Sequence, residues 1–279
     1  MTIKEEKDLI DLAVNGDQIA LEQLLASVQD LIFNLSLRML GMVSDAEDAT
    51  QEIFVKIMTN LSSFRKESRF QTWVYRIAIH FLLDYKKSMF SRYPLTFDDY
   101  SKDIVEGGGN ENNEYGGLEQ NLLAEELKMS CTNVMLQCLD AESRCIFILG
   151  TMFHPDSKIA GEVLGMTPEN YRQKLSRARK KMSGFLAEYC GLGGSKACSC
   201  QKRVAHAVQQ HRLDPEHLEY NALKWLDQDI LSRKKENMEQ LDQASLVFGQ
   251  LPSYKAPVEA KAFLKQILES PTMEKVLEQ

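Results

Sequence analysis

Three cysteines and a histidine in the last third of the chain carry side chains that can bind a metal ion. They are Cys190, Cys198, Cys200 and His206. Thiolate sulfur and imidazole nitrogen are common ligands of tetrahedral zinc. The spacing, Cys-x7-Cys-x-Cys-x5-His, differs from the common Cys-x2-Cys knuckle, so a glycine-rich turn with incidental cysteines is the favoured interpretation and a zinc site the alternative. Zinc is the only cofactor that the sequence suggests, and no cofactor is required.

Residues 157–179 have the pattern of a helix-turn-helix. Gly165 is placed to end the first helix with a positive φ, and Gly161 is small where the helices would touch. Thr167 would cap the second helix, and Pro168 would occupy its first turn. The outward face of this second helix would present Glu169, Asn170, Arg172, Gln173, Ser176, Arg177 and Lys180.

This face has the residue types that bind DNA. Arg, Gln and Asn read base edges in the major groove, and flanking Lys and Arg neutralise phosphates. Six cations and no acid fall between Arg172 and Lys181. An ordinary helical hairpin whose cations only aid solubility is the alternative.

Two predicted helices near the N-terminus carry opposite kinds of polar surface. Ser44 to Glu47 resembles a helix N-terminus with a capping oxygen, and the helix that follows runs to about Leu61. One face of it holds Asp45, Glu47, Asp48, Gln51 and Glu52. These acids would contact a partner or would simply be solvated.

A helix over residues 70–87 and the loop before it mix aromatic rings with cations. The candidates for contact with nucleic acid are Phe64, Arg65, Lys66, Arg69, Trp73, Arg76, His80, Lys86 and Lys87. Stacking surfaces among cations suit unpaired bases and backbone phosphates. Packing in the protein core is the alternative for the rings.

Hydrophobic periodicity predicts an all-α fold. Apolar residues recur at spacings of three and four over residues 5–40, and helices are also expected over 214–235 and 258–268. Ser101 to Gln120 is rich in glycine, asparagine and acids, so we expect a flexible linker there. The remaining cysteines, Cys131, Cys138 and Cys145, are expected to pack inside helices.

The composition is that of a soluble globular protein. The 279 residues carry a formal charge of −7, with 44% hydrophobic and 26% charged residues. No apolar run approaches the roughly 18 residues that a membrane span needs, and the first residues do not form a secretory signal. We therefore expect a cytoplasmic protein with reduced thiols and no membrane span. No catalytic constellation is visible, so an enzyme is not expected.

Three segments together resemble the bacterial sigma-70 family, in its extracytoplasmic-function (ECF) subgroup. Ile159–Lys181 is similar to the promoter-reading helix-turn-helix of that family. Asp45–Phe54 is similar to its polymerase-binding stretch, and Phe64–Ala78 to the part that opens the minus-ten element. One departure is Ile79-His80, where the family usually has Arg-Asn.

The resemblance implies two helical domains, an N-terminal helix bundle over residues 1–95 and a helix-turn-helix domain over 124–190. A flexible acidic linker over 96–123 would join them, and a small helical extension over 191–279 would follow. It also implies core RNA polymerase and promoter DNA as partners, with the acidic face on the polymerase, the aromatic-basic helix on the minus-ten element and the helix-turn-helix on the minus-thirty-five element. An anti-sigma factor is a further expected partner. A stand-alone helix-turn-helix regulator with a ligand-sensing N-terminal domain is the alternative function.

Overall fold

The computed structural model describes residues 3–107, 115–226 and 243–269. Every regular element in these residues is a helix, beside one isolated bridge between Trp225 and Tyr254. The predicted all-α class is therefore confirmed. None of the helices described combines the length and the apolar character needed to cross a membrane.

The N-terminal bundle contains α1 (Ile3–Val14), α2 (Gln18–Leu40), α3 (Val43–Asn60), α4 (Phe70–Asp84) and the short α5 (Met89–Arg92). The continuous pattern over residues 5–40 is split where Asp17 caps α2 by accepting from the amide of Ala20. The prediction of a cap at Ser44 is wrong, because α3 begins one residue earlier, after Met42, and has no side-chain cap. Helix α4 ends three residues before the predicted Lys87.

The predicted linker is helical over much of its length. Helix α6 (Phe97–Gly107) precedes residues 108–114, which lie outside the described residues, and α7 (Gly117–Gln137) begins three residues after them, with Gly116 at its N-cap. Tyr100 and Ile104, one helical turn apart, are buried, and the Tyr100 ring stacks 5.9 Å from that of Phe185. The expectation of a flexible connector over 96–123 is corrected accordingly, because this apolar pair docks α6 on its neighbours.

The helix-turn-helix consists of α9 (Ser157–Val163) and α10 (Pro168–Tyr189). It follows α8 (Ala141–Ile148) and the short π-helix η2 (Leu149–Phe153). The extension then holds η3 (Gly191–Gly193), α11 (Cys200–Gln209), α13 (Gln243–Gly249) and α14 (Ala260–Leu268). The last of these confirms the helix predicted over 258–268. The helix predicted over 214–235 is wrong for 214–226, which form turns, and the rest lies outside the described residues.

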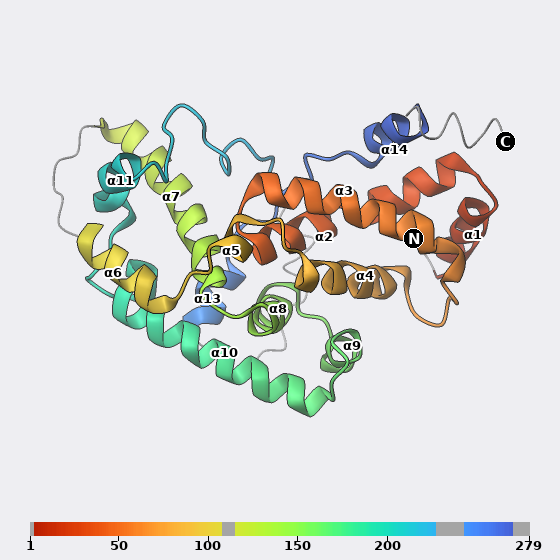
Figure 1. Ribbon diagram of the computed structural model, residues 1–279, viewed down its shortest axis with the longest axis horizontal. Coiled ribbons are helices and arrows are strands. Elements are labelled where there is room, and N and C mark those ends of the chain that lie inside the picture. The colour runs from red at the N-terminus through yellow and green to blue at the C-terminus, as the bar shows by residue number, and fades with distance from the viewer. Residues whose placement is uncertain (1–2, 108–114, 227–242, 270–279) are drawn as a thin grey trace.

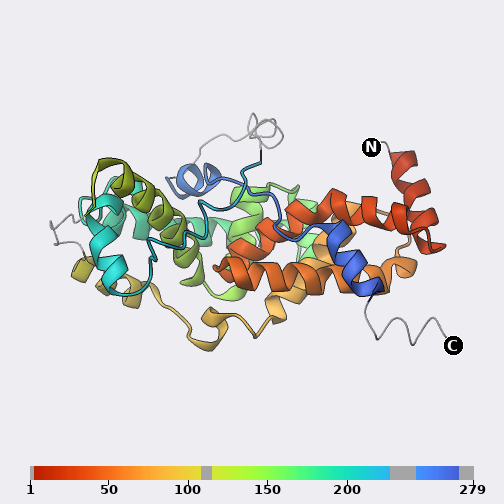
Figure 2. The same ribbon diagram turned by 90° about the horizontal axis from the view of Figure 1, so that it is seen from above.

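The elements form an elongated body in which distant parts of the sequence lie side by side. Figure 1 shows α1, α3 and α4 at one end, α6, α7 and α11 at the other, and α10 running beneath. Helix α2 contacts α7 and α8, so the N-terminal bundle packs directly on the helices that support the helix-turn-helix. Both views place α14, near the end of the chain, beside the N-terminal bundle (Figures 1 and 2).

Candidate functional site

The turn between α9 and α10 has the geometry that its residues predict. Gly165 has φ +65°, and a Cβ at Gly161 would come within 2.7 Å of the Met166 carbonyl oxygen. The Thr167 hydroxyl accepts from the amide of Asn170 at 3.2 Å and so caps α10. Tyr171 on α10 packs in a buried cluster with α8 and α9. The helix-turn-helix is confirmed as a structural unit.

The outward face of α10 is open to solvent. All seven of its predicted DNA-contacting residues are exposed: Glu169, Asn170, Arg172, Gln173, Ser176, Arg177 and Lys180. The structure thus brings the whole predicted set together on one helix surface.

Four of the six cations in this run have contacts within the chain. Arg172 donates to the Ser157 hydroxyl of α9 at 3.2 Å, and the other three contact elements away from the outward face. Lys174 pairs with Glu142 at 2.8 Å, and Arg179 donates to the Gly150 carbonyl at 2.8 Å. The ammonium of Lys181 lies 5.1 Å from the centre of the Phe97 ring, which holds α10 against α6. The cations on the outward face are therefore Arg172, Arg177 and Lys180.

The aromatic residues before and within α4 pack on one another. Phe64 and Phe70 are buried, and Trp73 is half-buried with its ring 5.1 Å from Phe64 and 5.8 Å from Phe70. The expectation that Phe64 is a surface contact is corrected, because its ring anchors the loop before α4 to the bundle. Trp73 keeps a partly open face.

The cations around α4 are on the surface, and several have acidic partners in the same chain. Arg65, Arg69, His80, Lys86 and Lys87 are exposed, whereas Lys66 and Arg76 are half-buried. Lys66 pairs with Asp11, Lys87 with Glu52 on α3, and Arg76 with Glu162 on α9. The last pair joins the aromatic-basic helix to the helix-turn-helix.

The acidic face of α3 is partly covered by the segment around α5. Asp48 is exposed, while Asp45, Glu47, Gln51 and Glu52 are half-buried. The carboxylate of Asp45 accepts from the Met89 amide at 3.2 Å. Burial raises the pKa of both Asp45 and Glu47, since it disfavours the ionised form. The structure confirms that these residues share one helix face.

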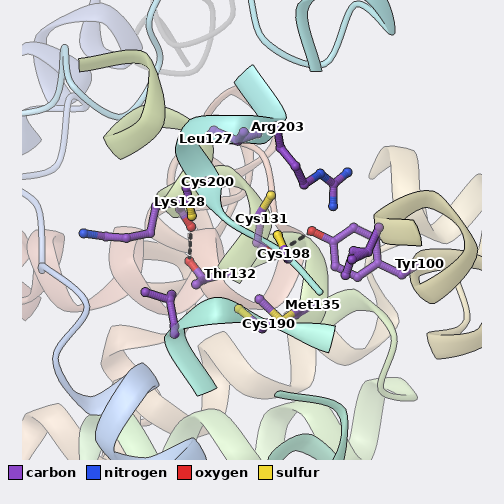
Figure 3. Close-up of a pocket in the computed structure, with 12 residues that line it drawn as sticks. Tyr100, Leu127, Lys128, Cys131, Thr132, Met135, Cys190, Cys198, Cys200 and Arg203 are labelled. Atoms are coloured by element: carbon purple, nitrogen blue, oxygen red, sulfur yellow. Dashed lines mark hydrogen bonds between the residues drawn. The ribbon is translucent and has the colours of Figure 1, made fainter. Parts of the chain in front are cut away.

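Four cysteines from four places in the sequence line one small cavity (Figure 3). Cys131 lies on α7 and Cys190 directly follows α10. Cys198 lies just before α11, and Cys200 is the first residue of that helix. The cavity has a volume of about 20 Å³. Burial raises the pKa of Cys131 and Cys190, and raises that of Cys200 to about 12.

His206 does not join these thiols. Its Nε2 lies 3.5 Å from the carboxylate of Asp103, which also pairs with Arg203 and Arg212. Among the residues that the structure describes, no three His, Cys, Asp or Glu side chains are arranged as a metal site. The predicted set of Cys190, Cys198, Cys200 and His206 is therefore not assembled here, and zinc binding by the thiols stays a prediction.

Sequence comparison places the N-terminal bundle in a known family. The family model described as sigma-70 region 2 matches residues 24–89, which hold most of α2 and all of α3 and α4. This part of the chain is therefore similar to region 2 of sigma-70 proteins. The match occupies the part of the chain where the alternative function required a ligand-sensing domain.

The proteins that this chain is similar to include ECF sigma factors. It is 40% identical over 78 residues to the ECF RNA polymerase sigma factor SigW of Bacillus subtilis, covering 28% of this chain and 42% of SigW. It is 33% identical over 121 residues to the ECF RNA polymerase sigma-E factor of Escherichia coli, covering 43% of this chain and 62% of the relative. The chain thus spans less than two thirds of the length of either relative.

A longer alignment exists with the RNA polymerase sigma factor CnrH of Cupriavidus metallidurans. It is 27% identical over 175 residues, which are 62% of this chain and 90% of CnrH. A solved structure of CnrH in complex with the cytosolic domain of CnrY covers 65% of this chain and 96% of the CnrH chain, with a TM-score of 0.49 and 22% identity.

Several buried or half-buried polar residues that position this site were not found from the sequence. Arg144 donates to the Met39 carbonyl at 2.7 Å and to three carbonyls at the end of α7 and just after it. Arg38 and Asn133, both buried, bond each other between α2 and α7. No local pattern marks the bonds from Arg144 to Met39 and from Arg38 to Asn133, because these partners are distant in the sequence.

Proposed function

We propose that this chain is an RNA polymerase sigma factor that binds core polymerase and directs it to promoters with minus-ten and minus-thirty-five elements. The carrying observation is the exposed polar face of α10 on a helix-turn-helix, in the same chain as a sigma-70 region 2. Together these two features fit a subunit that recognises DNA sequence for RNA polymerase.

The polymerase would contact the acidic face of α3. Asp48 is exposed at its centre, and its half-buried neighbours are Asp45, Glu47, Gln51 and Glu52. Carboxylates on one helix surface complement a basic partner surface and steer its association. An anti-sigma factor as a second protein partner stays a prediction.

The minus-ten element would contact the surface around α4. Trp73 offers a partly open ring for stacking, and the neighbouring cations Arg65, Lys66, Arg69, Arg76, Lys86 and Lys87, with His80, would bind phosphates and unpaired bases. The minus-thirty-five element would receive α10 in its major groove, where Arg172, Gln173 and Arg177 reach base edges or phosphates.

Charge reversal on α3 tests the proposed polymerase contact. The variant Asp48→Lys, Glu52→Lys should weaken co-purification with core polymerase by about 10-fold or more, which corresponds to about 1.4 kcal/mol. Glu119→Lys is the matched control, because Glu119 is exposed on α7, far from this face. Circular dichroism checks that both variants fold. Equal recovery of polymerase with the variant and the control would contradict the contact.

Promoter activity needs a separate test. Purified core polymerase with the full chain should initiate at discrete sites in a library of genomic fragments, and core polymerase alone should not. If the full chain adds no specific starts, the proposed function is wrong.

A further inference from the structure

The last part of the chain contacts both the N-terminal bundle and the helices around the helix-turn-helix. These two parts are here called the two units. Residues 220–226 and 248–264, here called the strap, lie against α2 and α3 on one side and against α7 and α8 on the other. The views in Figures 1 and 2 agree that this segment crosses the N-terminal bundle. Most of its hydrogen bonds to that bundle use main-chain groups of the strap, so they depend on the path of its backbone.

The contacts with α2 are buried and directional. The Asn34 side chain donates to the Tyr254 carbonyl at 2.7 Å and accepts from the Tyr254 amide at 2.9 Å. The Ala256 amide donates to Asp30 at 2.8 Å. The Asn34 side chain thus pairs with both the amide and the carbonyl of one strap residue, as the backbone of a neighbouring β-strand would.

Aromatic contacts extend this interface onto α3. Phe263 of the strap packs with its ring 5.4 Å from that of Phe54, which is fully buried. The Tyr220 hydroxyl donates to the Gly41 carbonyl at 3.0 Å, between α2 and α3. The strap therefore covers apolar surface of the region 2 unit.

The strap also bonds the helices that support the helix-turn-helix. The buried carboxylate of Glu126 on α7 accepts from the amides of Tyr220 and Asn221 at 2.9 and 2.8 Å. Arg38 of α2 donates to Asn133 of α7 at 2.7 Å and to the Pro252 carbonyl at 2.6 Å. One buried guanidinium thus touches both units and the strap.

The units held in this way also contact each other through their DNA-binding elements. Arg76 on α4 pairs with Glu162 on α9, and the Tyr75 ring meets that of Phe153 edge-on at 6.4 Å. Minus-ten and minus-thirty-five elements are about 25 base pairs apart, or roughly 85 Å of DNA at 3.4 Å per base pair. An arrangement in which α4 and α9 form an ion pair cannot reach both elements at once.

We propose that the strap is a built-in clamp that keeps the two units closed, so that it must leave α2 before the chain can span a promoter. This rests on the proposed function. Core polymerase is the partner whose binding would displace it, because the α3 acidic face and the strap lie on the same α2–α3 pair.

The experiment measures the separation of the units and transcription in parallel. Fluorophores are attached through unnatural amino acids at the exposed positions Ile19 and Ala187, which avoids the native thiols. The test variant is Tyr254→Ala, Ala256→Pro, which removes a buried ring and the amide that donates to Asp30. Lys255→Ala is the matched control, since Lys255 lies between them and is exposed.

We expect lower energy transfer in the test variant than in the wild type without polymerase, and at least about 5-fold more transcript at limiting core polymerase. The control should match the wild type in both. Equal transfer and equal transcript in test and control variants would overturn the clamp. Absence of specific transcript from every protein would instead contradict the proposed function, and the energy transfer would still decide the clamp.

A second measurement covers a test variant that does not fold. Hydrogen exchange of the wild-type strap, residues 252–260, is followed with and without core polymerase. Exchange should accelerate when polymerase is bound, because the Tyr254 and Ala256 amides lose their acceptors. Unchanged protection in the complex would overturn the clamp.

Discussion

The guanidinium of Arg38 donates to the side-chain oxygen of Asn133 at 2.7 Å, across the junction of α2 and α7, and both side chains are buried. Burial lowers the pKa of Arg38, so its charge depends on these bonds for compensation. This contact is one of several that join the N-terminal bundle to the helices that carry the helix-turn-helix.

Loss of either partner should destabilise the whole chain. Asn133→Ala leaves Nη1 of Arg38 without its acceptor, so we expect the free energy of unfolding to fall by about 2 kcal/mol. A double-mutant cycle with Arg38→Leu, followed by urea denaturation, should give a coupling energy of about 1–3 kcal/mol. Additive effects of the two substitutions would show that the bond does not couple the units.

The position of each cation on α10 predicts how strongly its removal weakens DNA binding. Arg177→Ala should weaken promoter binding by about 1–3 kcal/mol if its contact is a base edge, and should relax specificity at one position. If its contact is a phosphate, binding weakens for all sequences and the salt dependence falls. Lys174→Ala is the matched control, because Lys174 already pairs with Glu142. Equal effects of the two substitutions on DNA binding would contradict a reading role for this face.

The carboxylate of Asp103 should stabilise the docking of α6 on α11 in a pH-dependent way. Burial by itself would raise the pKa of Asp103, but hydrogen bonds from Arg212 and Arg203 outweigh it and hold the pKa well below its usual range. A carboxyl with a lowered folded-state pKa adds stability above its unfolded pKa of about 3.9, and this is lost as the pH falls through the folded pKa.

Asp103→Asn should therefore lower the free energy of unfolding at pH 7 by about 3 kcal/mol, since Arg203 is 2% exposed and keeps its charge. The difference from the wild type should shrink below about pH 4. Glu106→Gln, at an exposed position on the same helix, should change little at any pH. Denaturant titrations at several pH values measure this, and a constant difference between pH 7 and pH 3 would refute the assignment.

The four thiols are not arranged as a metal site in this structure, so a zinc ion that they bind must draw them together across their shared cavity, with Cys131 in place of the predicted His206. The four cysteines surround one cavity (Figure 3). His206 instead faces Asp103. Zinc titrated into reduced protein should be retained by the wild type and by His206→Ala, and lost from Cys131→Ser and Cys198→Ser. Because burial raises the pKa of Cys131, Cys190 and Cys200, binding must release protons and should weaken as the pH falls. Elemental analysis that finds well below one zinc per chain in the wild type would rule the site out.

The sequence by itself determined the features whose causes are local. Gly165, Thr167 and Pro168 set a turn and a helix start through their own backbone preferences, so the helix-turn-helix was predicted with its cap and its positive φ. The acidic face of α3 and the outward face of α10 follow from helical periodicity alone. The resemblance to sigma-70 proteins rests on the same contiguous stretches.

Only the tertiary structure decided which polar and apolar groups have partners elsewhere. The composition of Ser101–Gln120 indicated a linker, but Tyr100 and Ile104 find a surface on α10 and α11 that holds their helix. Arg38 bonds residues 95 and 214 positions away, and His206 turns to Asp103, 103 positions before it. Such contacts leave no periodic trace, because their free energy depends on burial and on the partner's position, which exist only once the chain is folded.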